Sequence, residues 1–359
     1  MRYVTVNNMR KGMLLARDVY DANAEVFLRE GAKLGNKQID QLSKQGFSGA
    51  YILDVASDDI VSDPIITQKE YLTAQRAVTR YMDMAYKSGD SGGVAVSLDE
   101  QKKVVLPILE TLRAKEHHLL VESLDIKPFA AYEPCHAVMV MVLSIAIGMK
   151  LKMTDEQLFE LGIGALLHDI GTAFLPENIL NRPGKLTDEE FDIVKGHVKK
   201  GYEYLMNNYS LSSAASMGAM QHHESYDGTG YPDGLRKKNI SVFGRIIAIT
   251  DVYDALVSKR AFRAAMYPMQ AIETVQNLSD RKFDPEIVNA LSEIIAPFPL
   301  GSVVHLRSGE TCIVKHNYVE DLLHPQVRVY DERSAKSAEI DMHTNPDYKN
   351  VRITKIVEV

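Results

Sequence analysis

Histidine and aspartate residues gather in the middle of this 359-residue chain in a pattern that could bind metal ions. Of the 11 histidines, five lie between positions 136 and 223, and adjacent pairs occur at His168-Asp169 and His222-His223. Imidazole and carboxylate groups bind hard to borderline divalent metals. A carboxylate can bridge two ions, whereas a histidine offers one lone pair. One shared Asp with several His therefore suits two ions about 3.5–4 Å apart.

Two of the acidic residues lie in apolar surroundings. Asp169 follows His168 in ALLHDIG, and Asp251 lies in the middle of RIIAITDVYDAL. A buried carboxylate is costly unless it is paired or bound to a metal. A single His-Asp dipeptide is common, and a lone His on an apolar helix face is usually a core residue. The prediction of a metal centre therefore rests on several His and Asp residues occurring together in one helical segment.

This combination is embedded in longer motifs. They are HDIG at His168–Gly171, HHESYDGTGYPDGL at His222–Leu235, DVYDALVSKRAFR at Asp251–Arg263, the run Leu175–His197, FDP at Phe283–Pro285 and HAVMV from His136. Together they resemble the HD-GYP family of cyclic-di-GMP phosphodiesterases, in the HD superfamily of metallophosphohydrolases, over roughly residues 116–297. The GMLLARDVYDANAEVFLREGAKL run near the N-terminus is similar to a module that often precedes this domain.

The resemblance implies a pair of metal ions bridged by Asp169. One ion is expected among His136, His168, Asp169 and Asp251, and the other among Asp169, His197, His222 and His223. Iron or manganese is implied, and a ligand set of oxygen and imidazole without thiolate agrees with that. Some family members bind a third ion through a Glu four residues before the first ligand histidine. Here that position is Tyr132, and Glu133 is expected near a helix N-terminus instead, so we expect two ions.

The resemblance also implies residues that act on the substrate. Thr172 stands where the family usually has a Lys that stabilises the transition state, and Thr donates one hydrogen bond but carries no charge. Tyr231 of the Gly-Tyr-Pro turn is expected to stack on a base or orient a phosphate; the alternative is turn packing. Arg260 and Arg263 are expected to grip a phosphodiester, rather than to lie on a solvated helix face.

The implied activity is metal-dependent hydrolysis of a cyclic dinucleotide. A metal-bridged hydroxide would attack phosphorus and open the ring to a linear dinucleotide, with a second hydrolysis to mononucleotides as an extension. Cyclic-di-GMP is the first expected substrate, and cyclic GMP-AMP the next. Two alternatives stay open: a catalytically weak or inactive cyclic-dinucleotide receptor, to which Thr172 points, and a metallophosphohydrolase acting on another nucleotide. A homodimer or a signalling protein is a further candidate partner.

Helical segments must position these residues. The patterns predict a strand pair within Asp18–Phe27, a helix over Asn36–Gln45 capped by Asn36, a strand from Tyr51 and a helix over residues 67–86. Lys87–Gly93 is expected as a flexible loop. Capping boxes begin at Ser97, Thr154 and Thr187, and almost no strand pattern occurs between Ser97 and Pro297. Beyond Pro299, SVVHL, ETCIV, QVRVY and VRITKIV read as strands.

The expected fold is mainly α. An all-helical HD-type catalytic domain carries a small N-terminal α+β module and a small C-terminal β domain. The expected boundaries are 1–60 for the N-terminal accessory module, 61–115 for a helical linker, 116–297 for the catalytic domain and 298–359 for the β module.

Composition agrees with a globular protein of ordinary type. The chain is 45% hydrophobic and its formal net charge is −7, which argues against a general nucleic-acid or anionic-membrane binder. Cys135 and Cys312 are far apart, which predicts neither a disulfide framework nor a zinc site and favours a reducing compartment. We see no secretory signal, and the apolar window Ala137–Met149 is too short to span a bilayer. A cytoplasmic location is therefore expected.

Overall fold

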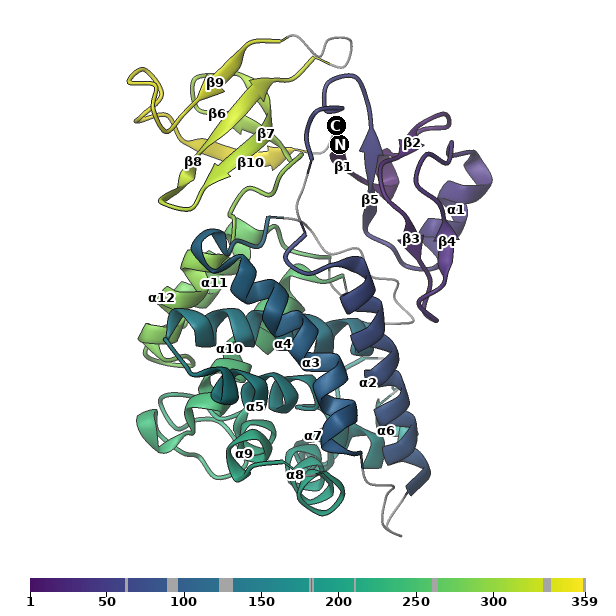
Figure 1. The fold of residues 1–359 in the computed structure, drawn as a ribbon, viewed down its shortest axis with the longest axis vertical. Coiled ribbons are helices and arrows are strands. Elements are labelled where there is room, and N and C mark those ends of the chain that lie inside the picture. The colour runs from purple at the N-terminus through teal and green to yellow at the C-terminus, as the bar shows by residue number, and fades with distance from the viewer. Residues whose placement is uncertain are drawn as a thin grey trace.

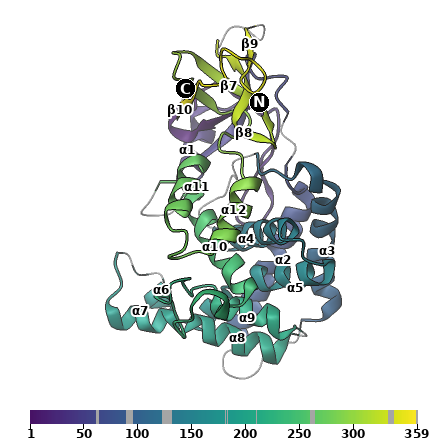
Figure 2. The same cartoon turned by 90° about the vertical axis from the view of Figure 1, so that its left-hand side faces the viewer.

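A helical body carries three small sheets at one end (Figure 1). The computed structural model describes residues 1–61, 64–88, 96–122, 132–180, 182, 184–209, 211–259, 264–331 and 337–357. Figure 2, turned by 90°, shows the sheets together above the helices, which confirms a helical domain with a C-terminal sheet. The predicted loop Lys87–Gly93 lies largely outside the described residues, and its first residue, Lys87, is still helical.

The helices follow one another from α2 onward. Their bounds are α2 Gln68–Ser88, α3 Leu98–Ala114, α4 Tyr132–Lys150, α5 Asp155–Leu166, α6 Glu177–Leu180, α7 Asp188–Lys195, α8 His197–Asn208, α9 Ser213–Gln221, α10 Val242–Val257, α11 Pro268–Asn277 and α12 Pro285–Ile294. Short 3₁₀ helices include η5 Ile170–Phe174, directly after the His168-Asp169 pair. The described part of residues 97–297 holds only isolated β-bridges, as the sequence predicted.

Local capping explains where several helices begin. The Thr154 and Thr187 hydroxyls accept the backbone N–H groups of Gln157 and Glu190, whose side chains accept the N–H of the capping threonine in return. Both capping boxes are confirmed. Ser97 also caps its helix through the N–H of Glu100.

Helix α4 is the central helix of the body. Its residues Cys135–Met149 are all buried, because an evenly apolar helix must be covered on every side. At 19 residues, α4 is long and apolar enough to cross a membrane, judged by length and composition alone. The 13-residue apolar window in the sequence therefore underestimated the length of this helix. In this structure 78% of its most apolar window is buried inside the helical domain.

The segment expected as a helical linker contributes to the main core. Val78 and Tyr81 of α2 and Ile108 of α3 belong to the same hydrophobic cluster as Met141 of α4 and Ile247 of α10. Helices α2 and α3 therefore pack as part of the helical body.

The first sixty residues contain a small sheet and one helix. The elements are β1 Arg2–Thr5, β2 Leu14–Leu15, β3 Val19–Tyr20, β4 Val26–Leu28, α1 Asn36–Lys44 and β5 Gly49–Leu53. Strands β1, β5 and β2 form an antiparallel sheet, and β3 pairs with β4 as a hairpin. Helix α1 begins as predicted, but its N-cap residue is Gly35 and not Asn36, because Asn36 already has helical backbone and the side chain of Gln38 accepts the N–H of Gly35.

The C-terminal sheet is antiparallel in the order β10-β6-β7-β8-β9. Its strands are β6 Val303–Leu306, β7 Thr311–Tyr318, β8 Asp321–Val329, β9 Glu339–Asp341 and β10 Ile353–Val357. The four predicted strands are confirmed. Strand β9 was not predicted, because three residues with one buried side chain leave almost no alternating pattern.

Candidate metal centre

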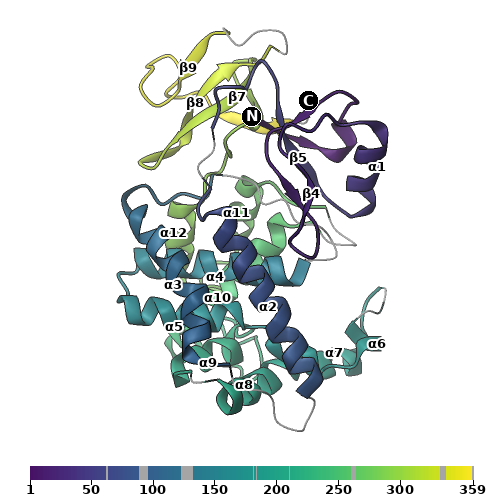
Figure 3. The same cartoon turned by 45° about the vertical axis from the view of Figure 1, so that its right-hand side comes forward.

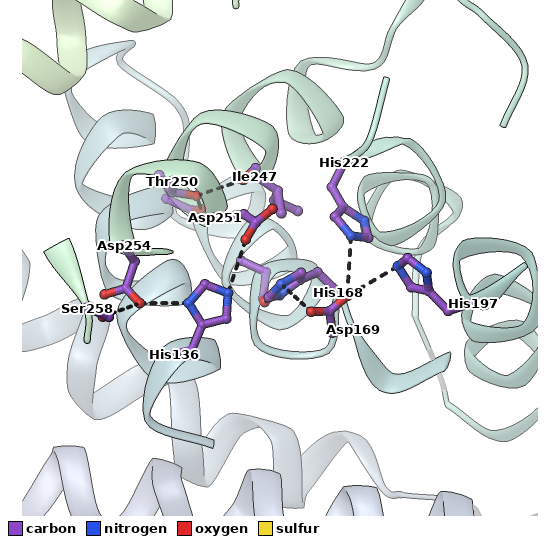
Figure 4. Close-up of polar contacts among 12 residues, drawn as sticks. His136, His168, Asp169, His197, His222, Ile247, Thr250, Asp251, Asp254 and Ser258 are labelled. Carbon is purple, nitrogen blue, oxygen red and sulfur yellow. Dashed lines mark hydrogen bonds and ion pairs between the residues drawn. The ribbon is translucent and has the colours of Figure 1, made fainter. Parts of the chain in front are cut away.

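The predicted site residues come from separate places in the helical body and meet at its centre (Figure 4). His136 lies near the start of α4, the His168-Asp169 pair links α5 to η5, and His197 opens α8. His222 and His223 follow α9, and Asp251 lies in α10. Most of them therefore lie at helix ends, where the chain changes direction toward the centre.

The candidate ligands form two groups. The groups are His136, His168 and Asp251, and Asp169, His197, His222 and His223, each with its candidate ligand atoms within 4.8 Å of one another. The seven residues expected around the two ions are therefore brought together.

Asp169 faces both groups. Its Oδ2 atom lies 3.3 Å from Nε2 of His168, while its Oδ1 atom lies 3.3 Å from Nε2 of His197 and 3.4 Å from Nε2 of His222. The neighbouring imidazoles are almost fully buried, yet 42% of the Asp169 side-chain surface stays exposed. The carboxylate is therefore accessible and offers one oxygen to each group.

Three of the histidines are oriented in the same way. The Nδ1 atoms of His168, His197 and His222 each lie 2.7 Å from a backbone carbonyl oxygen three residues earlier. A carbonyl only accepts, so each Nδ1 carries the proton and each Nε2 directs a lone pair toward Asp169. These three Nε2 atoms are buried and have no hydrogen-bond partner. Lone pairs facing a carboxylate repel it, and cations between them would satisfy both, so these residues fit a divalent metal pair.

His136 is held differently. Its Nδ1 atom lies 2.6 Å from Oδ2 of Asp254, and its Nε2 atom lies 3.1 Å from Oδ1 of Asp251. Burial lowers the pKa of His136, but the hydrogen bonds and charges of both carboxylates outweigh it and raise the pKa to about 9. Asp254, which Ser258 also contacts, was missed by the sequence analysis. The available signal was its spacing of three residues from Asp251 on an apolar helix, which places both on one face.

The electrostatics favour ionised carboxylates and a neutral His223 at this centre. Burial raises the pKa of Asp169, but the three histidines around it, when protonated, hold that pKa well below its usual range. The pKa of Asp251 is likewise depressed against burial, by His136 in particular. Burial, reinforced by His222, lowers the pKa of His223 to about 2. Ionised carboxylates and a neutral His223 are therefore available to a cation.

A cavity of about 470 Å³ opens onto this centre. It is lined by five of the candidate ligands, His136, His168, Asp169, His223 and Asp251, and also by Thr172 and Tyr132. The Thr172 hydroxyl donates to the carbonyl oxygen of Asp169 at 2.8 Å, so its proton is already engaged. Tyr132 stacks on His136 with 5.3 Å between ring centroids and 13° between ring planes, and Glu133 lies in the first turn of α4, as predicted.

The Gly-Tyr-Pro turn lies against one of the candidate ligands. The Tyr231 ring stacks on His223 at 4.7 Å between centroids, and it is not among the described residues that line the cavity. Buried Glu224 fixes this turn, because its carboxylate accepts the backbone N–H groups of Asp233 and Leu235 at 2.8 and 2.9 Å. The sequence analysis assigned no role to Glu224, although it directly follows the histidine pair.

Two predicted substrate contacts cannot be placed. Arg260 and Arg263 lie outside the described residues, which end at Lys259 and resume at Ala264. Their predicted phosphate contacts stay predictions.

Comparison with known proteins identifies the helical body. The family model described as an HD domain matches residues 118–287, which include all seven candidate ligands. The predicted resemblance to HD-GYP proteins is confirmed.

Several curated relatives match this HD domain. The chain is 36% identical over 217 residues to the cyclic di-GMP phosphodiesterase PA4108 of Pseudomonas aeruginosa, a match covering 60% of this chain and 52% of that protein. It is 37% identical over 146 residues to the cyclic di-GMP phosphodiesterase response regulator RpfG of Xanthomonas campestris, covering 40% and 39%. It is 40% identical over 128 residues to 3′3′-cGAMP-specific phosphodiesterase 2 of Vibrio cholerae, covering 35% and 24%. The chain thus spans about half or less of the length of these relatives.

Among solved structures, Bd1817, an HD-GYP-type protein from Bdellovibrio bacteriovorus, aligns with a TM-score of 0.46 and 19% identity, over 81% of this chain and 98% of that one.

Proposed function

We propose that this protein is a metal-dependent phosphodiesterase that hydrolyses a cyclic dinucleotide, cyclic-di-GMP first and cyclic GMP-AMP next. The observation that carries the proposal is the accessible Asp169 carboxylate, whose two oxygens face separate groups of candidate ligands at an open cavity. The names of the curated relatives, which act on cyclic di-GMP or 3′3′-cGAMP, support the substrate class.

Two divalent ions fit the proposal, with Asp169 shared between them. One would be held with His136, His168 and Asp251, and the other with His197, His222 and His223. Iron or manganese suits a set of imidazole and carboxylate ligands without thiolate. Such ions supply a water-derived nucleophile at neutral pH and stabilise charge on phosphoryl oxygens.

The chain's own groups would orient the ligands and receive the substrate. The backbone carbonyls and Asp254 hold the Nδ1 protons, which keeps the Nε2 lone pairs directed at the centre. Water would add to phosphorus and the 3′ oxygen would leave with a proton, which opens the ring to a linear dinucleotide. Thr172, Tyr231, Arg260 and Arg263 are proposed as the substrate contacts.

The test is an anaerobic assay of the full chain loaded with Fe(II) or Mn(II). We expect ring opening of cyclic-di-GMP or 3′3′-cGAMP, followed by product chromatography. Asp169→Ala should lose at least one metal ion and essentially all turnover. Asp83→Ala, at an exposed position, should keep its metal ions and its turnover. A wild-type protein with two ions that turns over neither ring would refute the proposal, and a full metal complement in Asp169→Ala would refute the bridging role.

A second candidate function is a cyclic-dinucleotide receptor. It is favoured by Thr172, which brings no charge to the cavity and whose hydroxyl proton is already donated to a backbone carbonyl. The same assay separates the two functions, because a receptor would bind the ring in equilibrium measurements without consuming it.

We further infer the organisation around this site. Residues 1–60 would form an accessory module, residues 61–115 would join residues 116–297 as the catalytic unit, and residues 298–359 would form a β module. The shared core of α2, α3 and the later helices supports this joining. A cytoplasmic location is supported by two buried cysteines, Cys135 and Cys312, neither of which is in a disulfide.

A further inference from the structure

The cavity at the metal centre is lined by two kinds of side chain. The candidate ligands, Thr172 and Glu133 are polar or charged. Most of the remaining lining is apolar and includes Val78 and Met82 of α2 and Val252 and Leu256 of α10. A ligand that fills this cavity therefore needs a charged part and a separate apolar face.

Helix α2 lies outside the segment that matches the HD domain family, which begins at residue 118. Figure 3 shows α2 running along the length of the helical body. Val78 and Met82 are four residues apart and so share one face of the helix. Val78 is buried and Met82 is half-buried, and both pack in or against the main core. The part of the apolar lining formed by Val78 and Met82 thus belongs to an element that the family match does not cover.

The position of α2 is also fixed by contacts with the N-terminal segment. Arg76 donates from Nη2 to the carbonyl oxygen of Ala24 at 2.8 Å, and buried Gln75 donates to that of Ala22 at 3.4 Å. Both carbonyls lie at the tip of the β3–β4 hairpin. Helix α2 is therefore held both by the helical core and by the N-terminal segment, which gives Val78 and Met82 a defined place at the cavity.

A cyclic dinucleotide matches this division of the cavity. Its phosphates carry charge, and its bases have flat, apolar faces. A methionine side chain is flexible and polarisable and makes favourable sulfur contacts with aromatic rings. We propose that Met82, supported by Val78, contacts a base of the cyclic dinucleotide and thereby fixes the position of the cyclic dinucleotide relative to the metal centre. This assignment rests on the proposed phosphodiesterase function and names a specificity-determining residue of that site.

The same helix offers a matched control. Met84 is also half-buried against the main core but is not among the described residues lining the cavity. Met82→Ala removes the proposed contact and Met82→Trp fills the space. Met84→Ala and Met84→Trp make the same chemical changes without reaching the cavity. Measuring metal content and the unfolding midpoint for all four variants separates an effect on substrate from an effect on folding.

The experiment measures KM and kcat for cyclic-di-GMP and for 3′3′-cGAMP, together with equilibrium binding of the linear product pGpG. We expect both Met82 variants to raise KM and weaken pGpG binding at least fivefold, with unchanged metal content. The ratio of KM values for the two rings should also shift. Both Met84 variants should stay within twofold of wild type.

The outcomes distinguish this inference from the proposed function. If the wild type turns over the rings but the Met82 variants keep wild-type KM, ring preference and pGpG binding, the assignment of Met82 is wrong while the phosphodiesterase function stands. If equal KM changes appear in the Met82 and Met84 variants, the effect comes from packing of α2 and the assignment is also wrong. If the metal-loaded wild type turns over neither ring, the proposed function itself fails.

Discussion

At the scale of single residues, the four histidines with a defined Nδ1 partner are not equivalent. His168, His197 and His222 donate Nδ1–H to neutral backbone carbonyls, whereas His136 donates to the buried carboxylate of Asp254. A carboxylate partner makes an imidazole a stronger donor to a metal than a carbonyl partner does. The group that contains His136 should therefore bind its ion in a different electronic environment from the other group.

Asp254→Asn tests this difference. The amide oxygen can still accept from Nδ1 of His136, so the geometry is kept while the negative charge is lost. We expect metal affinity at one of the two positions to fall about 10–100-fold, in the range found for groups that orient metal ligands. Competition with a chelator, read by metal analysis at limiting chelator, measures this loss. Ser258→Ala, which removes a long contact of 3.4 Å to Asp254 and leaves the Asp254 charge in place, should change affinity little. Equal affinities in Asp254→Asn and wild type would contradict the role.

The residue scale also shows what the sequence could reveal about the site. His168-Asp169 and His222-His223 stand in long motifs, so the sequence singled them out before any geometry was known. Asp254 was missed, because it acts through His136, which lies 118 residues earlier, and its spacing from Asp251 does not reveal that partner. That Met82 lines the cavity was missed too, because no pattern in the sequence places α2 beside the metal centre.

At the scale of elements, the site depends on how closely η5 approaches α8. A Cβ atom on Gly171 would lie 1.9 Å from the carbonyl oxygen of His197 and 2.6 Å from the backbone nitrogen of Gly201. Real Cβ atoms do not come that close to backbone atoms. The glycine of HDIG therefore allows the turn that carries Asp169 to lie directly against the start of the helix that carries His197.

Gly171→Ala should separate these two elements. Because the clash is with backbone and not with the end of a flexible side chain, we expect a loss of about 1–3 kcal/mol in the free energy of unfolding, typical of overpacking. We also expect weaker metal binding, since His197 moves away from Asp169. Urea unfolding and metal titration measure the two effects. Gly196→Ala is the control, because its nearest contact is a single carbonyl at 3.0 Å. Equal stability of the two variants would show that the close approach is not needed.

Elements were predicted well where local chemistry decides them. The threonine capping boxes and the alternating C-terminal strands depend on neighbouring residues and were found. The N-cap of α1 and strand β9 were not, because Gly35 carries no capping side chain and β9 exists through pairing with β8. Whether a helix is a linker or part of a core is likewise decided by distant contacts, as for α2.

At the scale of the whole molecule, the two ends of the chain are joined. The backbone N–H of Tyr3 donates to the carbonyl oxygen of Gly301, and Arg328 of β8 bonds both the carbonyl oxygen of Ala56 and the carboxylate of Asp59. From the sequence alone, we interpreted the first and last sixty residues as separate modules. Pairing between segments some 270 residues apart in the chain leaves no local pattern that could predict it.

Arg328 is the centre of this junction. The guanidinium is 3% exposed, forms a two-pronged ion pair with Asp59 at 2.7 and 2.5 Å and contacts Glu339 at 2.8 Å. Lys315 adds a second cation to both acids. The hydrogen bonds from Arg328, opposed by burial and supported by Lys315, hold the pKa of Asp59 well below its usual range. A depressed carboxyl pKa stabilises the folded state above the unfolded pKa and loses that contribution as the pH falls toward the folded value.

Arg328→Met keeps much of the apolar volume and removes the charge. Because Asp59 and Glu339 remain partly exposed, screening by solvent limits the loss to about 1–3 kcal/mol at pH 7, between values for surface and buried pairs. The difference in the free energy of unfolding between Arg328→Met and wild type should become smaller on acidification. Protonation of Asp59 in the unfolded chain contributes up to about 0.4 kcal/mol to this change at pH 3.9, and more at lower pH. Urea unfolding at pH 7 and at pH 3.9 or below measures both values. Lys44→Met, which removes an exposed ion pair with Asp40, should leave the free energy of unfolding nearly unchanged. Metal binding at the HD domain should be unchanged in Arg328→Met. A difference that stays constant with pH would mean that packing of the arginine stem, and not its charge, joins the two ends of the molecule.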